Sequence, residues 1–322
     1  MPNGSSEAAA GLGLPQRVEL VDVGPRDGLQ TLSQTIPTEH KIELIEAIVD
    51  AGIRSVEAVS FAHPRVLPQL ADAEAVMTGL RRREGVVYRG LVPNLRGAHR
   101  ALGCGVDEMV CLVSCDDDLN LRNQGMDVEA TLAQIEQTTE LARAQARSVS
   151  VVIALAFFML GKGPTPFERL RAICRRLAGF GVERLTLAAS VGMADPRQVF
   201  ETVCRLRAEL PRVQFGLHLH NRNGMALANA FAGLLAGVSW LEGSILGVGG
   251  DAWFPADDVT VLGNVPMEDL VQMTELIGVE TGVDLQRYLQ ASRLAESILG
   301  QRSASFLVRG GTRAMLASAR WD

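Results

Sequence analysis

The sequence predicts an α/β protein built on a single (β/α)₈ barrel (a TIM barrel), with extra helices at its C-terminal end. Eight short runs rich in β-branched residues recur along the chain, and a segment with apolar residues at helical spacing follows each of them. The first run leads into Gly24-Pro25-Arg26-Asp27-Gly28, which is unlike the glycine-rich phosphate turn of a dinucleotide-binding fold. The barrel is therefore favoured over a doubly wound sheet.

Each strand is predicted from an apolar run, and each helix from the spacing of apolar residues between turn signals. After the first strand, Ile42, Ile45 and Val49 recur at helical spacing, with Thr38 as the predicted N-cap and Gly52 as the helix end. The eight predicted strands are residues 18–23, 55–60, 86–92, 108–113, 148–158, 184–188, 214–220 and 239–244.

Helical patterns continue after the last predicted strand, at residues 266–277 and 285–299. We therefore expect a barrel domain over residues 17–300, with these helices attached to it. A small, polar segment at residues 1–16 is expected to form a flexible N-terminal tail. Residues 301–322, rich in Ser and Arg, are expected to form a C-terminal tail.

The composition excludes several classes of protein. Apolar residues make up 47% of the chain, which is enough to form a core and excludes intrinsic disorder. The net charge is 31 − 37 = −6 and no dense basic stripe occurs, so we expect no nucleic-acid partner. No uncharged apolar run approaches the roughly 18 residues of a membrane span. Five cysteines without regular spacing indicate reduced thiols, and no targeting segment is evident, so a cytoplasmic location is expected.

Two histidines at the end of the seventh predicted strand are the strongest local signal of chemistry. In His218-Leu219-His220 both imidazoles point to one face, because side chains along a strand alternate with period two. The C-terminal ends of barrel strands form the mouth, where active sites of this fold lie. The alternatives are a metal site and two partly buried histidines that are hydrogen-bonded to the backbone.

Arg26 and Asp27 follow the first predicted strand and therefore lie at the same mouth. Asp27 could add a carboxylate oxygen to the two imidazoles, a ligand set that suits Mg²⁺, Mn²⁺, Fe²⁺ or Zn²⁺ without selecting one. The alternative is an ordinary surface ion pair. Glu57 lies within the second predicted strand and needs a partner there, either in a salt bridge to Arg26 or in a catalytic role.

The run Gly247-Val248-Gly249-Gly250, with Asp251 after it and Gly263-Asn264 further on, follows the eighth predicted strand. It is either a mobile loop over the mouth or a simple connection.

These residues belong to a longer set of motifs that resembles the 3-hydroxy-3-methylglutaryl-CoA lyase family, metal-dependent aldol lyases and synthases on TIM barrels. The resemblance extends from about residue 17 to residue 299. The matching motifs in chain order are Val23-Gly24-Pro25-Arg26-Asp27-Gly28-Leu29-Gln30, Ile36-Pro37-Thr38 with Lys41-Ile42-Glu43-Leu44, Glu57-Ala58 with Ser60-Phe61, Pro68-Gln69 with Ala71-Asp72, Val92-Pro93-Asn94-Leu95, His218 and His220 with Gly224, Ala226-Leu227-Ala228-Asn229, and Gly263-Asn264 with Glu268-Asp269-Leu270-Val271.

The resemblance implies a retro-aldol cleavage of a 3-hydroxy-3-methylglutaryl-CoA-like acyl-CoA to an acyl-CoA enolate and a keto acid. It also implies a homodimer and a divalent cation, usually Mg²⁺ or Mn²⁺. Arg26 would stabilise the enolate and Glu57 would lie beside it. Separately from the resemblance, we expect Gln30 and Arg222 to contact the substrate. The implied metal ligands are Asp27, His218, His220 and Asn264.

Three departures from the family pattern bear on the reaction. The family cysteine after the loop glycines is replaced by Asp251, and no cysteine lies beyond Cys204. The usual Gly-Asp-Thr motif reads Ala188-Ala189-Ser190, and the usual Asp-Thr-Tyr run after His220 reads Asn221-Arg222-Asn223. We therefore expect Asp251, or a metal-bound water, to replace the thiol in proton transfer.

Other functions remain open at this point. A related lyase or synthase could act on another hydroxy acid or acyl-CoA, such as a citramalyl-CoA-like compound, and Arg222 would suit an additional carboxylate. A non-haem iron oxygenase would use both histidines and Asp27 as a facial triad. A homologue that binds a metal without catalysis is the third alternative.

Overall fold

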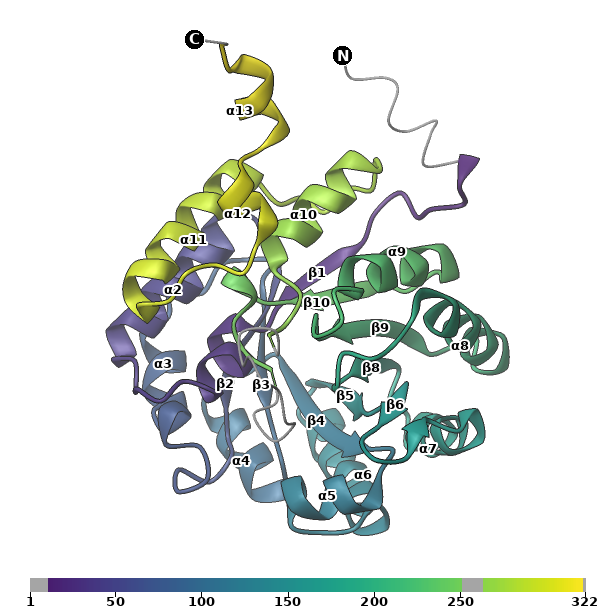
Figure 1. Cartoon of the computed structure of the whole chain (residues 1–322). Coiled ribbons are helices and arrows are strands. Elements are labelled where there is room, and N and C mark those ends of the chain that lie inside the picture. The colour runs from purple at the N-terminus through teal and green to yellow at the C-terminus, as the bar shows by residue number, and fades with distance from the viewer. Residues whose placement is uncertain (1–10, 251–262, 321–322) are drawn as a thin grey trace.

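The computed structural model describes residues 11–250 and 263–320. Eight parallel strands close into a barrel in the order β1-β10-β9-β8-β5-β4-β3-β2, with helices around it (Figure 1). The predicted (β/α)₈ barrel is confirmed. The barrel strands are β1 (Glu19–Asp22), β2 (Ser55–Ser60), β3 (Val87–Leu91), β4 (Glu108–Ser114), β5 (Ser148–Ala154), β8 (Arg184–Ala189), β9 (Gln214–Leu219) and β10 (Trp240–Gly243).

The fifth barrel strand is shorter than the sequence predicted. It ends at Ala154 rather than at Phe158, because Leu155 takes a positive φ of 54° that turns the chain out of the barrel. Residues after this turn form a small antiparallel hairpin of β6 (Phe158–Met159) and β7 (Gly163–Pro164). The apolar run therefore contains a barrel strand and the start of a separate hairpin.

Helices alternate with the strands and cover the outside of the barrel. Several begin at an acidic or amide N-cap, as at Asn94, whose side chain accepts a hydrogen bond of 3.0 Å from the Gly97 amide. The helices and helical turns before β10 are η1 (Gly24–Gly28), α2 (Thr38–Asp50), η2 (Pro68–Leu70), α3 (Ala73–Gly79), α4 (Leu95–Gly103), α5 (Asp117–Gln124), α6 (Val128–Ala144), α7 (Phe167–Gly179), α8 (Pro196–Glu209) and α9 (Ala226–Ala236).

The predicted cap of α2 was wrong at its start. Thr38 is the first helical residue and Pro37 occupies the N-cap, with no side-chain cap hydrogen bond. The Thr38 hydroxyl instead donates a hydrogen bond of 2.7 Å to Asp72, the residue directly before α3. At the other end Gly52 has a φ of 107°, the left-handed region that glycine enters without a steric penalty.

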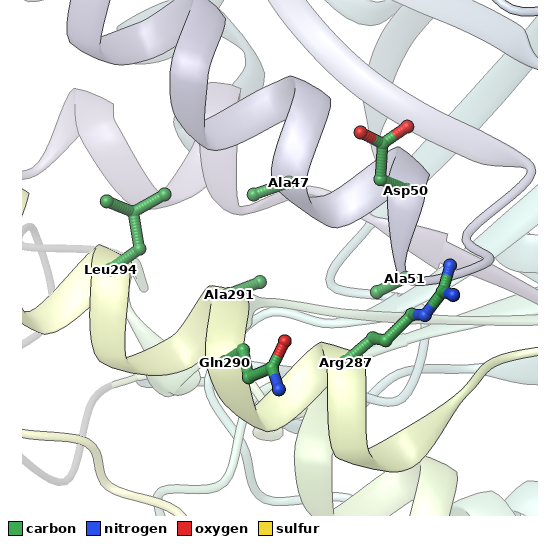
Figure 2. Close-up of a pocket in the computed structure, with 7 residues that line it drawn as sticks. All are labelled: Ala47, Asp50, Ala51, Arg287, Gln290, Ala291 and Leu294. Carbon is green, nitrogen blue, oxygen red and sulfur yellow. The ribbon is translucent and has the colours of Figure 1, made fainter.

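Additional helices follow β10 and pack beside the start of the chain. The turn η3 (Ile245–Gly247) leads towards α10 (Met267–Leu276) and α11 (Leu285–Leu299). A surface pocket of about 280 Å³ lies between α2 and α11. Its lining residues include Ala47, Ala51 and Ala291 (Figure 2). None of the predicted site residues lines this pocket.

The segment after residue 300, expected as a tail, carries two short helices, α12 (Phe306–Gly310) and α13 (Arg313–Ser318). The buried Ser305 donates a hydrogen bond of 2.6 Å to Asp269 of α10, and the amides of Phe306 and Leu307 donate to the same carboxylate. These contacts attach the segment to the barrel domain. Among the described residues, no helix is long and apolar enough to cross a membrane.

Candidate metal centre and active site

The loop after β1 forms a buried turn that holds two of the predicted site residues. Arg26 and Asp27 lie within η1, a π-helical turn in which the Asp27 amide donates a hydrogen bond of 2.7 Å to the Val23 carbonyl. The Asp22 side chain accepts from the Gly24 amide at 2.8 Å and so fixes the entry to the turn. A Cβ at Gly24 would lie 2.9 Å from that carboxylate, so the close approach requires glycine.

Three predicted metal ligands come together at the mouth of the barrel. One ligand atom each from Asp27, His218 and His220 lies within 4.8 Å of the others, and this is the one such cluster in the described part of the chain. All three side chains are buried, and the Nε2 atoms of the two histidines are 3.0 Å apart. The alternation of side chains along β9 continues to His220, which forms an isolated bridge with Asn264, so both imidazoles point towards Asp27.

The amide of Asn264 completes this cluster. Its Nδ2 donates hydrogen bonds to Asp27 Oδ2 at 2.6 Å and to the Val248 carbonyl at 3.0 Å. Its Oδ1 is buried and has no hydrogen-bond partner among the described residues, which leaves an oxygen donor free for a cation. A carboxylate, an amide oxygen and two imidazoles fit a divalent ion, but they do not select among Mg²⁺, Mn²⁺, Zn²⁺ and Fe²⁺.

The electrostatics of Asp27 and His220 favour the protonation states that a cation needs. Burial raises the pKa of Asp27, but the neighbouring Arg26, His218 and His220 outweigh it, so the pKa lies below its usual value. Burial and the nearby His218 lower the pKa of His220 to about 4. An ionised carboxylate and a neutral imidazole are the forms that bind metals. At His218, burial lowers the pKa, but the hydrogen bond to Glu242 and the charge of Asp27 outweigh it and raise the pKa above its usual value.

A buried guanidinium lies directly beside these ligands. Arg26 donates from Nε to Glu57 at 2.6 Å and from Nη1 to Asp27 Oδ1 at 2.8 Å. Burial alone would lower the pKa of Arg26, but the Glu57 and Asp27 carboxylates raise it above its usual value, so the group stays charged. The salt bridge between Glu57 and Arg26 is therefore present, and the second Glu57 oxygen has no hydrogen-bond partner among the described residues.

The two residues predicted to contact substrate lie in different surroundings. Gln30 donates a hydrogen bond of 2.7 Å to Asp27 and accepts one of 3.4 Å from Arg26, so it supports both groups. Arg222 is half-buried in the loop after β9. The loop after β8 approaches it closely, because a Cβ added at Gly192 would lie 2.9 Å from the Arg222 backbone nitrogen. The Arg222 loop and the loop after β8 are thus in contact.

The glycine-rich run approaches the metal ligands closely. Gly249 has a φ of 109°, and a Cβ there would lie 2.5 Å from Asn264 Nδ2 and 2.9 Å from Asp27 Oδ2. A side chain would therefore collide with the cluster, which gives Gly249 a structural role that the sequence did not specify. The predicted catalytic residue Asp251 lies outside the described residues.

Two charged residues that the sequence analysis did not single out, Asp22 and Glu242, contact the loops and one histidine of the site. Asp22 accepts hydrogen bonds from the Gly24 and Ile245 amides and from the Tyr288 hydroxyl, which joins the loops after β1 and β10 to α11. Burial raises the pKa of Asp22 to about 6 despite these hydrogen bonds. Glu242 on β10 lies 3.1 Å from His218 Nδ1. Glu242 is a lone charge in an apolar strand, the same signal that identified Glu57.

Comparison with known proteins agrees with this geometry. The family model described as HMGL-like matches residues 17–295. The chain belongs to this family. It is 31% identical to the mitochondrial hydroxymethylglutaryl-CoA lyase of Gallus gallus over 93% of this chain and 99% of the relative, and 33% identical to the Bacillus subtilis lyase YngG over 89% and 95%.

A solved structure is similar over nearly the whole HMGL-like chain. It is an HMG-CoA lyase from Acinetobacter baumannii in complex with coenzyme A and 3-methylmalate, with a TM-score of 0.89 and 31% identity. The match covers 95% of this chain and 98% of that one.

Replacing Gly249 tests the geometry of the cluster. In Gly249→Ala the added methyl group would displace Asn264 or Asp27, so the dissociation constant for Mn²⁺ should rise by on the order of tenfold or more. Titration followed by the EPR signal of free Mn²⁺ measures this constant.

Gly125→Ala is the matched control, because Gly125 also has a positive φ, of 68°, but no atom lies within 4 Å of its added Cβ. The control should bind Mn²⁺ like the unmodified protein. A folded Gly249→Ala protein with unchanged Mn²⁺ affinity would contradict the geometry.

Proposed function

We propose that this protein is a divalent-metal-dependent carbon–carbon lyase that performs retro-aldol cleavage of a 3-hydroxy-3-methylglutaryl-CoA-like acyl-CoA. The products are an acyl-CoA enolate and a keto acid. The observation that carries the proposal is the convergence of Asp27, His218, His220 and Asn264 beside the buried Arg26 at the barrel mouth. Membership of the HMGL-like family supports the same reaction.

Asp27, His218, His220 and Asn264 would hold the cation, Mg²⁺ or Mn²⁺ by resemblance. A divalent cation there supplies Lewis-acid chemistry, which lowers the pKa of a substrate hydroxyl. The protein's own contribution is a rigid ligand set, because Asp27 is held by Arg26, Gln30 and Asn264 at the same time.

Arg26 would stabilise the negative charge that cleavage leaves on the acyl-CoA enolate. Its guanidinium is charged, buried and held by Glu57 and Asp27, so little reorganisation is needed when the charge develops. Glu57 orients the guanidinium through its contact of 2.6 Å. Charged groups that are held in place before the reaction are the usual basis of electrostatic catalysis.

Proton transfer must use a group other than a family-type loop thiol. Burial raises the pKa of both Cys111 and Cys115 to about 12, so neither supplies a thiolate near neutral pH. The family cysteine position is occupied by Asp251. We propose Asp251 for this role from its place in the sequence, directly after Gly250.

The substrate is proposed to be an acyl-CoA, because the Acinetobacter baumannii relative was solved with coenzyme A and 3-methylmalate. The second candidate is a citramalyl-CoA-like lyase, since 3-methylmalate is an isomer of citramalate; Arg222 of the changed run Asn221-Arg222-Asn223 would pair with the substrate carboxylate. We also propose a homodimer by resemblance, and a cytoplasmic location, which the free cysteines support.

Incubation with 3-hydroxy-3-methylglutaryl-CoA and Mg²⁺ or Mn²⁺ tests the reaction. We expect acetyl-CoA and acetoacetate in equal amounts, and no turnover after removal of divalent ions with EDTA. Parallel assays with a citramalyl-CoA thioester test the second candidate. If neither thioester is cleaved under any metal condition although the protein binds Mn²⁺, both candidate substrates are wrong and a non-catalytic homologue is favoured.

Arg26→Met tests the role of the guanidinium on whichever substrate is cleaved. Loss of a preorganised charge at the developing enolate should lower kcat by about 10²–10³-fold. Arg26→Lys is the matched variant, because it keeps the charge beside Glu57 and loses only the planar fork, so its kcat should fall less. An unchanged kcat in a folded Arg26→Met protein that still binds Mn²⁺ would exclude this role.

A further inference from the structure

The interior of the barrel contains a buried ion network that reaches one of the proposed metal ligands. It joins Arg89 on β3 to Glu242 on β10, and Glu242 to His218 on β9. Arg89 and Glu242 are almost completely buried, and neither belongs to the motifs that the sequence analysis singled out. We infer that Glu242 is a positioning residue for His218, and that Arg89 holds Glu242 in place.

The orientation of the Glu242 carboxylate is fixed by donors from three other residues. Its Oε1 accepts hydrogen bonds from Arg89 Nη1 at 3.1 Å, from Thr186 Oγ1 at 3.1 Å and from Trp240 Nε1 at 3.3 Å. These donors lie on β3, β8 and β10, so the carboxylate is held across the interior of the barrel. Its Oε2 is then left for His218.

The contact between Glu242 Oε2 and His218 Nδ1 is 3.1 Å long. Since an ionised carboxylate only accepts hydrogen bonds, this contact requires the proton of His218 to lie on Nδ1. The lone pair of His218 Nε2 is then available on the side of His220 and Asp27, where the cluster converges. A carboxylate behind a histidine ligand fixes the tautomer and ring orientation and raises the ligand's basicity.

Arg89 is itself held in place by a second carboxylate. Its Nε lies 2.8 Å from Glu108 Oε1 and its Nη2 donates to Ser150 Oγ at 3.0 Å. Ser150 in turn donates to Glu108 at 2.8 Å. Glu108 and Glu242 therefore both contact Arg89. Within the described part of the chain, Glu108 makes no hydrogen bond or ion pair with His218, so it serves as a matched control.

The inference rests on the proposed metal centre, so its test measures metal binding rather than turnover. Glu242→Gln keeps the size of the side chain and removes its charge. We expect its dissociation constant for Mn²⁺, measured by EPR, to rise about 10–100-fold. Glu108→Gln removes an equal charge beside Arg89 without removing a partner of His218, so it should weaken Mn²⁺ binding much less than Glu242→Gln does.

The protonation of the His218 ring in the unmodified protein offers a second readout. In a ¹⁵N-histidine NMR spectrum of the Mg²⁺-loaded protein, assigned by comparison with His218→Asn, the proton of His218 should lie on Nδ1. A proton on Nε2 with a bare Nδ1 would overturn the inference.

The outcomes separate this inference from the proposed function. A folded Glu242→Gln protein with unchanged Mn²⁺ affinity would overturn the positioning role and leave the metal centre intact. Equal weakening in Glu108→Gln would also overturn it, because the effect would then come from the barrel interior in general. If the unmodified protein itself binds no Mn²⁺, the proposed metal-dependent function is wrong, and the positioning role that rests on it is wrong as well.

Discussion

The two oxygens of the Asp27 carboxylate join the segments from which the site is built. One oxygen accepts hydrogen bonds from Arg26 and Gln30, and the other accepts from Asn264. Burying an isolated carboxylate is costly, so this carboxylate is stable where cations and donors surround it. Arg26, Gln30 and Asn264 all lie where they satisfy that one group.

The barrel supplies the convergence that this charge requires. Asp27 and Asn264 are 237 residues apart in sequence, yet they are hydrogen-bonded, because β1 and β10 are neighbours that deliver their loops to one mouth. Asp22 strengthens the same junction by binding backbone amides of both loops. A rigid pair of loops keeps the ligand atoms in place without help from substrate.

The barrel and the convergence of the histidines could be predicted from sequence because both depend on local periodicity. His218 and His220 share a face whatever the rest of the fold does. The ion network of Arg89 and Glu242 could not be predicted, because a lone charge in an apolar strand shows that a partner is needed but not which strand provides it. The hairpin after β5 was missed for another reason, since a single residue with positive φ interrupts an otherwise continuous apolar run.

The residues proposed as metal ligands converge at the barrel mouth, so a metal centre there is the central claim. A crystal structure of protein grown with Mn²⁺ tests it most directly, through the anomalous difference map at the manganese absorption edge. The account predicts one strong peak within about 2.0–2.3 Å of ligand atoms of Asp27, His218, His220 and Asn264. An empty site in crystals that hold Mn²⁺ elsewhere would contradict it.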